Sequence, residues 1–314
     1  MNAVTLRLGS RRSPMAIEQS RQVAELITER TGHRVEIVGV TTLGDVSRAQ
    51  LTQIGGTGVF VSALREALLG GEVDLAVHSL KDLPAADPPG LVLAAVPPRD
   101  DPRDALIARD GAKLADLPSG ARIGTGSPRR AAQLLGLRGD LRCVPIRGNA
   151  GTRLEKVGRS ELDGVVLAYA GLARIGCLNA VTQVFEPDEM LPAPGQGALA
   201  VECRDDSSGI AGLLQAISDP PSMAAAIAER SLLEALAAGC SAPIGGYAEG
   251  VQQLRMRAVV MSTDGARVLR ALGGARSGEA RQLGRDLAAE LLRAGAGDLI
   301  SVPREPTSSG NDVQ

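Results

Sequence analysis

Two segments far apart in the chain repeat one pattern, in which a short apolar run is followed by small hydroxyl residues, a proline and paired arginines. The first has the run Val4–Gly9 before Ser10–Pro14, and the second has Ala121–Gly124 before Thr125–Arg130. Each run fits a strand, and the proline fits the first turn of a helix that follows it. Ligands of open α/β sheets bind beyond the carboxyl ends of strands, and helix N-termini favour anions. The repeat therefore predicts an α/β protein with an anion site, although an ordinary strand-to-helix turn would explain either segment alone.

The stretch Glu72–Asp82 ends an apolar run in a similarly abrupt way. Val73–Val77 fits a buried strand, and the sequence then turns polar up to Lys81 and Asp82. Several prolines, beginning with Pro84, prevent a helix from carrying these side chains away. We therefore expect Lys81 and Asp82 on the rim of a cleft, and a solvated Lys–Asp pair at a strand end is the alternative.

Length and composition limit the class of protein. A chain of 314 residues is expected to form two or three domains. It has no apolar run as long as the roughly 18 residues of a membrane span, and no apolar signal segment at its start, so we expect a cytoplasmic protein that does not bind membranes. The net charge is −2, and with two Phe, two Tyr and no Trp the chain cannot build base-stacking platforms. Nucleic acid is therefore not an expected partner.

The four cysteines are Cys143, Cys177, Cys203 and Cys240, and no two of them are close in sequence. This spacing predicts neither a metal site nor a disulfide framework. Cys203 lies in an apolar alternation and fits a core thiol. Cys240 lies among small residues, where either a buried loop thiol or a reactive, modified cysteine would fit.

Arginines recur at expected strand ends and in the first turns of helices. Only three lysines occur among the 34 basic residues, and Arg is the side chain that binds carboxylates in bidentate fashion. The positions concerned are Arg129, Arg130, Arg147, Arg153 and Arg174. Together they indicate a shared anion site, with solvated surface arginines as the alternative.

The remaining segments suggest how the chain is divided. Arg99–Asp104 fits a charged crossing between domains, and Met190–Gly197 fits a hinge. Gly55–Gly58 fits either a mobile loop or backbone that lies close to a ligand. Helix Met223–Ala238 is expected to end at a left-handed Gly239. Strands and an amphipathic helix after it predict a small third domain.

In this order the motifs closely resemble those of the porphobilinogen deaminase family, from about residue 4 to residue 300. The motifs are Arg11–Pro14, Gly55–Phe60, His78–Asp82, Arg129–Arg130, Arg147–Asn149 with Gly151–Arg153, Pro194–Gly197 and Gly239–Cys240. The resemblance implies an α/β fold with two lobes like those of periplasmic binding proteins, joined by a hinge, and a small α+β C-terminal domain. The implied boundaries are residues 1–99 with 198–217, residues 100–197, residues 218–302 and a disordered tail at 303–314.

The resemblance also implies the chemistry. The family holds a dipyrromethane primer covalently on the cysteine that matches Cys240, adds four porphobilinogen molecules with loss of ammonia, and hydrolyses off hydroxymethylbilane. Asp82 would be the catalytic carboxylate. The implied cofactor-binding residues are Cys240, Lys81, Ser13, Thr125, Ser127, Arg129, Arg130, Arg147 and Gly148, and those for the substrate are Arg11, Arg147, Arg153, Arg174 and Gln196. No metal is implied.

This chain departs from the family's usual residues at Thr57, Gly126 and Pro128, which leaves the contacts of those loops open. The competing interpretation is a non-catalytic two-lobed anion-binding protein, which would explain the arginines and the hinge but would give Asp82 and Cys240 no task. We also expect a monomer, because no long apolar seam remains once the helices are assigned to cores.

Overall fold

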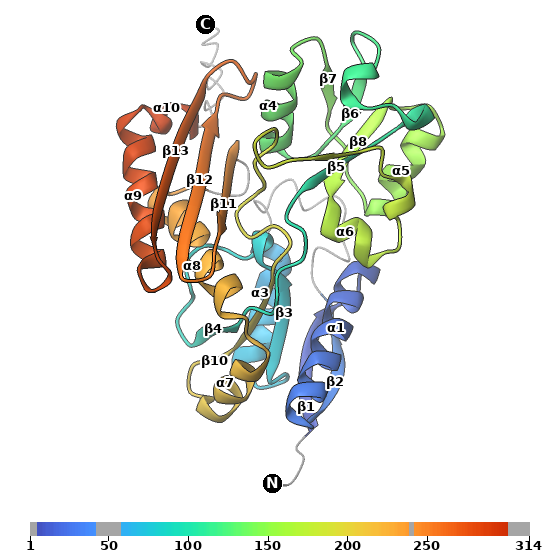
Figure 1. The fold of residues 1–314 in the computed structure, drawn as a ribbon. Helices are drawn as coiled ribbons and strands as arrows, with labels where there is room; N and C mark the ends of the chain where they lie inside the picture. The colour runs from blue at the N-terminus through green and yellow to red at the C-terminus, as the bar shows by residue number, and fades with distance from the viewer. Residues whose placement is uncertain (1–4, 42–57, 239–241, 301–314) are drawn as a thin grey trace, which may run out of the picture.

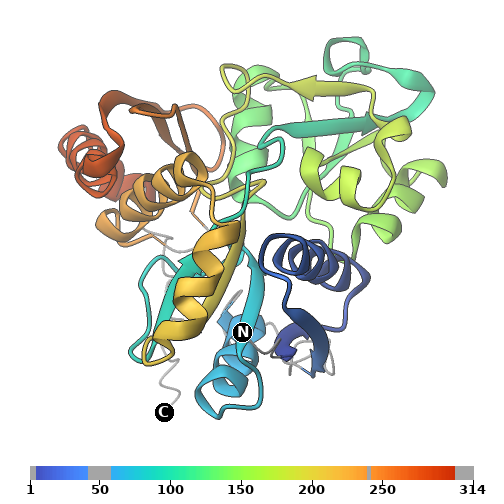
Figure 2. The ribbon, with the colours of Figure 1, turned by 60° about the horizontal axis from the view of Figure 1, so that its bottom comes forward.

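The computed structural model describes residues 5–41, 58–238 and 242–300, which form three sheets with their helices (Figure 1). Two sheets have five strands each and the third has three. The two larger sheets form lobes that lie one above the other in Figure 1, and the small sheet lies to one side of both (Figure 2). The prediction of an α/β protein with two lobes and a small C-terminal domain is confirmed.

The first sheet has the strand order β2-β1-β3-β10-β4. Its strands are β1 (Thr5–Arg11), β2 (Arg34–Val40), β3 (Leu75–Ser79), β4 (Leu91–Ala95) and β10 (Leu199–Arg204). Helices α1 (Pro14–Thr31) and α7 (Ser208–Leu214) pack on one face, and α3 (Gly58–Leu69) packs on the other. Because helices cover both faces of the sheet, the strands are mostly apolar. Polar side chains are therefore found mainly at the ends of the strands.

The second sheet has the order β7-β6-β8-β5-β9. Its strands are β5 (Asp104–Ala108), β6 (Arg122–Gly124), β7 (Arg142–Val144), β8 (Gly164–Ala168) and β9 (Gln183–Phe185). Helix α4 (Pro128–Leu137) packs on one face, and α5 (Ala150–Gly158) and α6 (Tyr169–Arg174) pack on the other.

The two lobes share one topology. In each, three parallel strands are followed by an antiparallel strand that the chain adds after crossing from the other lobe, β10 in the first and β5 in the second. The unit β1–α1 therefore matches β6–α4, which is the repeat that the sequence shows at Ser10–Pro14 and Thr125–Arg130. The carboxyl ends of the parallel strands carry the candidate site residues in both lobes.

The third sheet is antiparallel and packs against two long helices. Its strands are β11 (Ile244–Glu249), β12 (Gln253–Met261) and β13 (Val268–Arg276), and its helices are α8 (Pro220–Ala235), α9 (Ala280–Arg293) and α10 (Ala296–Ile300). Leu283, Leu287 and Leu291 of α9 are buried in this core, as their spacing predicts. Short 3-10 turns lie at η2 (Leu80–Asp82), η3 (Arg109–Gly111), η4 (Leu114–Asp116), η5 (Leu178–Ala180), η6 (Gln215–Ile217) and η7 (Ser277–Glu279).

Three expectations about elements were wrong. Asp104 does not belong to a charged crossing but begins the buried strand β5, where distant arginines hold its carboxylate. The small-residue stretch after Cys240 contains strand β11, which the glycines in it obscured. The helix expected at Met223–Ala238 is α8, which begins at Pro220 and ends at Ala235. Gly239 lies outside the described residues, so the left-handed cap expected there stays a prediction.

Candidate functional site

Lys81 and Asp82 lie where the sequence predicts, directly after the buried strand β3. The chain enters the 3-10 turn η2 there, so both side chains leave the end of the sheet and remain partly exposed. Asp82 forms no hydrogen bond or ion pair with any other residue in the described ranges. Burial, with the nearby charge of Arg130, lowers the pKa of Lys81 to about 8, while Asp82 and Asp104 act in the opposite direction. Lys81 therefore lies close to Arg130 of the other lobe, and both side chains donate to the same oxygen of Gln196.

Arg129 and Arg130, in the first turn of α4, share one buried carboxylate. Asp104 is 0% exposed, and its Oδ2 accepts a hydrogen bond from Arg129 Nη1 at 2.7 Å while its Oδ1 accepts one from Arg130 Nε at 2.9 Å. These arginines are 3% and 6% exposed. Despite burial, their charges hold the pKa of Asp104 far below its usual range. Two cations and one anion meet here, so the cluster keeps an excess of positive charge.

Gln196 connects this cluster to the first lobe. Its amide nitrogen donates to Asp104 Oδ1 at 2.8 Å and to the Pro102 carbonyl at 2.7 Å. Its amide oxygen accepts from Arg130 Nη2 at 3.2 Å and from Lys81 Nζ at 3.4 Å. The side chain that was predicted to bind substrate thus bridges Lys81 of the first lobe and the Arg130–Asp104 pair of the second.

The glycines beside Gln196 allow this close approach of the backbone. A Cβ on Gly195 would lie 2.9 Å from the backbone nitrogen of Lys81, and one on Gly197 would lie 2.5 Å from the carbonyl oxygen of Asp100. Both residues have positive φ, 78° and 86°, which favours glycine. The rigid and then flexible run that predicts a hinge therefore places Gln196 between the lobes.

Ser13 and Ser127 are the N-caps of α1 and α4. Ser13 Oγ accepts from the Ala16 N–H at 3.3 Å, and Ser127 Oγ accepts from the Arg130 N–H at 3.4 Å. The Ser127 N–H in turn donates to Thr125 Oγ1 at 3.2 Å. Each hydroxyl keeps its own proton to donate, so a cap can also bind an anion at the helix N-terminus.

Arg147 and Arg153 lie beyond the end of β7, on the same side of the second sheet. Arg147 is exposed and has no ion pair with a residue in the described part of the chain. Arg153 Nε donates to the carbonyl of Gly148 at 2.9 Å, and Gly148 has φ 107°, which favours glycine. Burial, and then the charge of Arg130, lowers the pKa of Arg153. These guanidiniums extend the positive surface outward from the Arg130 cluster.

Arg174 and Arg11 lie further along the strand ends. Arg174 Nη2 donates to Asp100 Oδ2 at 2.5 Å and to the Gly197 carbonyl at 3.1 Å, so this arginine holds the chain crossing in place. Arg11 is the last residue of β1 and is partly buried. Cys240 and Thr57 lie outside the described residues, so their geometry is not described.

The sequence did not predict two buried carboxylates of the site region. Asp104 could have been recognised, because the apolar run Ala105–Ala108 that follows it fits a strand. Glu229 is 0% exposed in α8, where it pairs with Arg99 at 2.6 Å and accepts from the Gly195 N–H at 2.5 Å. Its position inside an alanine-rich helix gave no signal of this role. Glu229 ties the third domain to the hinge.

The described ranges contain neither a metal-binding cluster nor a membrane-spanning helix. No three His, Cys, Asp or Glu side chains gather there in a way that could hold a metal ion. None of the helices in those ranges combines the length and apolarity that crossing a bilayer requires.

Comparison with known proteins gives two family matches and close relatives. The model described as "Porphobilinogen deaminase, dipyromethane cofactor binding domain" matches residues 6–211, and the one described as "Porphobilinogen deaminase, C-terminal domain" matches residues 223–293. Porphobilinogen deaminase from Thermobifida fusca is 59% identical over 96% of this chain and 97% of its own length. Porphobilinogen deaminase 1 from Streptomyces coelicolor is 52% identical over 96% and 98%. A solved periplasmic substrate-binding protein from Coxiella burnetii matches 68% of this chain and 92% of its own, with 17% identity and a TM-score of 0.43.

Proposed function

The chain belongs to the porphobilinogen deaminase family, and from this premise we propose which of its residues perform the reaction. The protein is a transferase of tetrapyrrole biosynthesis that uses a dipyrromethane cofactor and acts on porphobilinogen. The family joins four porphobilinogen molecules head to tail with release of ammonia. Our proposal includes hydroxymethylbilane as the product of this chain.

Asp82 is the proposed catalytic residue. Loss of ammonia from porphobilinogen leaves an electrophilic methylene-pyrrole cation, and the ring carbon that attacks it must later lose a proton. A carboxylate beside that position stabilises the cation and accepts the proton. The observation that carries this assignment is the geometry of the strand end, where Asp82 stays unpaired within the described ranges while Lys81 contacts Gln196.

The arginines and hydroxyls are the proposed carboxylate ligands. Every pyrrole ring of the substrate bears an acetate and a propionate, so a growing chain brings many negative charges into the cleft. Arg129 and Arg130 have one carboxylate between them, and Arg147 and Arg153 extend the positive surface. We assign Lys81, Ser13, Thr125, Ser127, Arg129, Arg130, Arg147 and Gly148 to the cofactor, and Arg11, Arg147, Arg153, Arg174 and Gln196 to the substrate.

The donor set of the described residues fits a dipyrromethane, because guanidiniums, an ammonium and capping hydroxyls are the groups that bind its carboxylates. When bound, this group supplies the ring carbon to which the next pyrrole is joined. Cys240 is the proposed point of covalent attachment. In that assignment, Arg129 and Arg130 orient the group, and Gln196 keeps them in register with Lys81 across the lobes.

The wider assignments are proposals of the same kind. We propose a cytoplasmic monomer that binds neither nucleic acid nor membranes. Its domains would comprise residues 1–99 with 198–217, residues 100–197 and residues 218–302. The non-catalytic anion-binding protein is disfavoured, since the relatives at 52% and 59% identity are porphobilinogen deaminases.

Intact-protein mass spectrometry tests the attachment. The purified protein is expected to carry a stable adduct of two pyrrole units, and Cys240→Ser is expected to show only the mass of the bare chain. Cys203→Ser is the matched control, because Cys203 is buried in β10 and is expected to leave the adduct in place. An adduct that persists in Cys240→Ser would contradict the assignment.

A further inference from the structure

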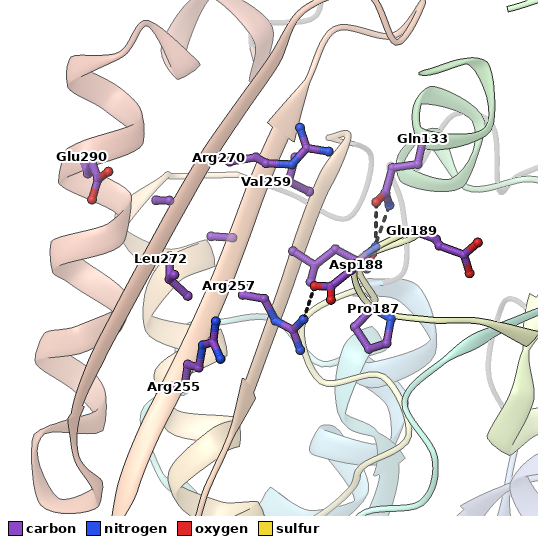
Figure 3. A pocket seen from close by; sticks show the side chains of 13 residues that line it. Gln133, Pro187, Asp188, Glu189, Arg255, Arg257, Val259, Arg270, Leu272 and Glu290 are labelled. Atoms are coloured by element: carbon purple, nitrogen blue, oxygen red, sulfur yellow. Dashed lines mark hydrogen bonds and ion pairs between the residues drawn. The ribbon is translucent and has the colours of Figure 1, made fainter. Parts of the chain in front are cut away.

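A cavity of about 510 Å³ lies between the third sheet and the segment that follows β9 (Figure 3). It lies on the face of the sheet opposite the one that packs against α8 and α9. Strands β12 and β13 line one side, and residues 187–189 with Leu191 and Gln133 line the other. Its volume lies in the range of small-molecule sites. None of its lining residues belongs to the set proposed for porphobilinogen or the cofactor, so the reaction gives this cavity no task.

The three arginines of the cavity are not equivalent. Arg257 already has partners within the protein, because it pairs with Asp188 at 2.5 Å and with Glu249 at 3.0 Å and lies over the ring of Tyr247. Arg255 and Arg270 are exposed and form no ion pair with any residue of the described chain. The cavity therefore offers two guanidiniums that are available to an anion.

The strand register separates these two guanidiniums. Arg255 lies opposite Gly274, Arg257 lies opposite Leu272, and Arg270 lies opposite Val259. Four residues of β12 separate the level of Arg255 from that of Arg270, which is about 13 Å along the strand. Between the two levels lies Leu272, whose side chain is 56% exposed. The cavity thus has a cation at each end, and in the middle the exposed Leu272 lies beside the Arg257–Asp188 ion pair.

We propose that this cavity binds a small, elongated dicarboxylate with an apolar body. Each carboxylate pairs with one guanidinium, a bidentate geometry that Arg favours, and the body covers Leu272. A small inorganic anion would leave the leucine exposed and would reach only one arginine. Glu290 lines the cavity from α9, beyond β13 from Asp188 (Figure 3), and disfavours a further negative charge there.

The occupant also contacts the segment that leads to the hinge. Gln133 holds this segment through two hydrogen bonds with the backbone of Leu191, at 2.7 Å and 3.0 Å, and Asp188 holds it through Arg257. Five residues later the same segment reaches Gln196. A bound dicarboxylate is therefore expected to slow amide hydrogen exchange at residues 188–191.

The test is calorimetric titration of the holoenzyme with suberate, an eight-carbon dicarboxylate. One double variant locates the site. The protein with both Arg255→Gln and Arg270→Gln is expected to bind suberate at least about tenfold more weakly, since charged hydrogen bonds are lost at both ends. Arg285→Gln, at an exposed position on α9, is the matched control and is expected to bind as the wild type does. Arg147→Gln changes the proposed porphobilinogen cleft and is also expected to leave suberate binding intact.

Ligand variants test the chemical class. Succinate is too short to reach both arginines, and octanoate has one carboxylate, so each is expected to bind at least about tenfold more weakly than suberate. Glu290→Gln is expected to tighten suberate binding, because it removes a like charge. The proposal is overturned if the double variant binds suberate like the wild type, if Arg147→Gln abolishes binding, or if succinate binds as well as suberate.

Discussion

Replacing Asp104 by Asn tests how the buried arginine pair is held. The substitution keeps the shape of the side chain but removes the charge that accepts from Arg129 at 2.7 Å and from Arg130 at 2.9 Å. Two guanidiniums would then be buried without the one carboxylate that they share. Breaking a buried ion pair from one side typically costs about 3–5 kcal/mol. We expect the free energy of unfolding of the second lobe to fall by about that amount.

Equilibrium unfolding of the holoenzyme in urea measures this loss. Glu155→Gln is the matched control, because Glu155 pairs with Arg159 in the same lobe and both side chains are exposed. An ion pair between exposed side chains contributes about 0–1 kcal/mol, so the control is expected to lose much less. If Asp104→Asn lost no more stability than Glu155→Gln, the buried pair would not be the stabilising element that we describe.

The same substitution gives a pH dependence with a definite sign. The folded-state pKa of Asp104 is held far below its usual range, chiefly by the charges of Arg129 and Arg130, which outweigh the effect of burial. The contribution of the Asp104 carboxylate to the free energy of unfolding is therefore fully present above its pKa in the unfolded chain, about 4. This contribution is lost as the pH falls toward the lower pKa of the folded state. The difference in stability between the wild type and Asp104→Asn is expected to stay constant near neutral pH and to narrow below about pH 4. A difference that widens in acid would contradict this account.

Three further perturbations follow from the site. Cys240→Ser is expected to fold but to release no ammonia from porphobilinogen, whereas Cys203→Ser keeps activity and loses some stability through a buried hydroxyl; urea unfolding and ammonia release measure the two effects. Arg147→Leu is expected to fail early in chain growth, because a carboxylate of the growing chain loses its cation, so mass spectra of enzyme-bound intermediates will differ from those of the wild type. Gly197→Ala places a Cβ 2.5 Å from the Asp100 carbonyl at a φ of 86°, so it is expected to displace the crossing and lower both stability and activity. Wild-type intermediates in Arg147→Leu, or wild-type stability in Gly197→Ala, would argue against these roles.

Local signals made most of the elements predictable. Helix α1 begins at Pro14 after a capping serine, and β1 and β6 lie at the apolar runs Val4–Gly9 and Ala121–Gly124 that predict strands. The sequence did not predict β11, because Gly245 and Gly246 weaken the strand pattern. This segment is a strand because it pairs with β12, which follows it in the chain. Residues in register with a partner strand can form a strand that their own propensity does not indicate.

The residues of the candidate site that follow strand ends were predictable, but the contacts that Asp104 and Gln196 make between distant segments were not. Lys81, Asp82 and the arginines could be located because polar residues directly follow apolar runs. The carboxylate of Asp104 could not be assigned to Arg129 and Arg130, because its partners are contributed by α4, which is more than 20 residues later. Gln196 connects four groups from both lobes, and only the folded structure brings those groups together.

Single-turnover release of ammonia by protein that already carries its cofactor tests the central role of Asp82 most directly. Asp82→Asn keeps the shape but removes the proton acceptor and the anion, and loss of general acid–base catalysis alone costs about 10² to 10⁴ in rate. Asp82→Glu keeps the charge and displaces it by one methylene, so the expected order of rates is wild type, then Glu, then Asn. If cofactor-loaded Asp82→Asn released ammonia within a few-fold of the wild-type rate, Asp82 would be only a structural neighbour of Lys81 and the catalytic assignment would be wrong.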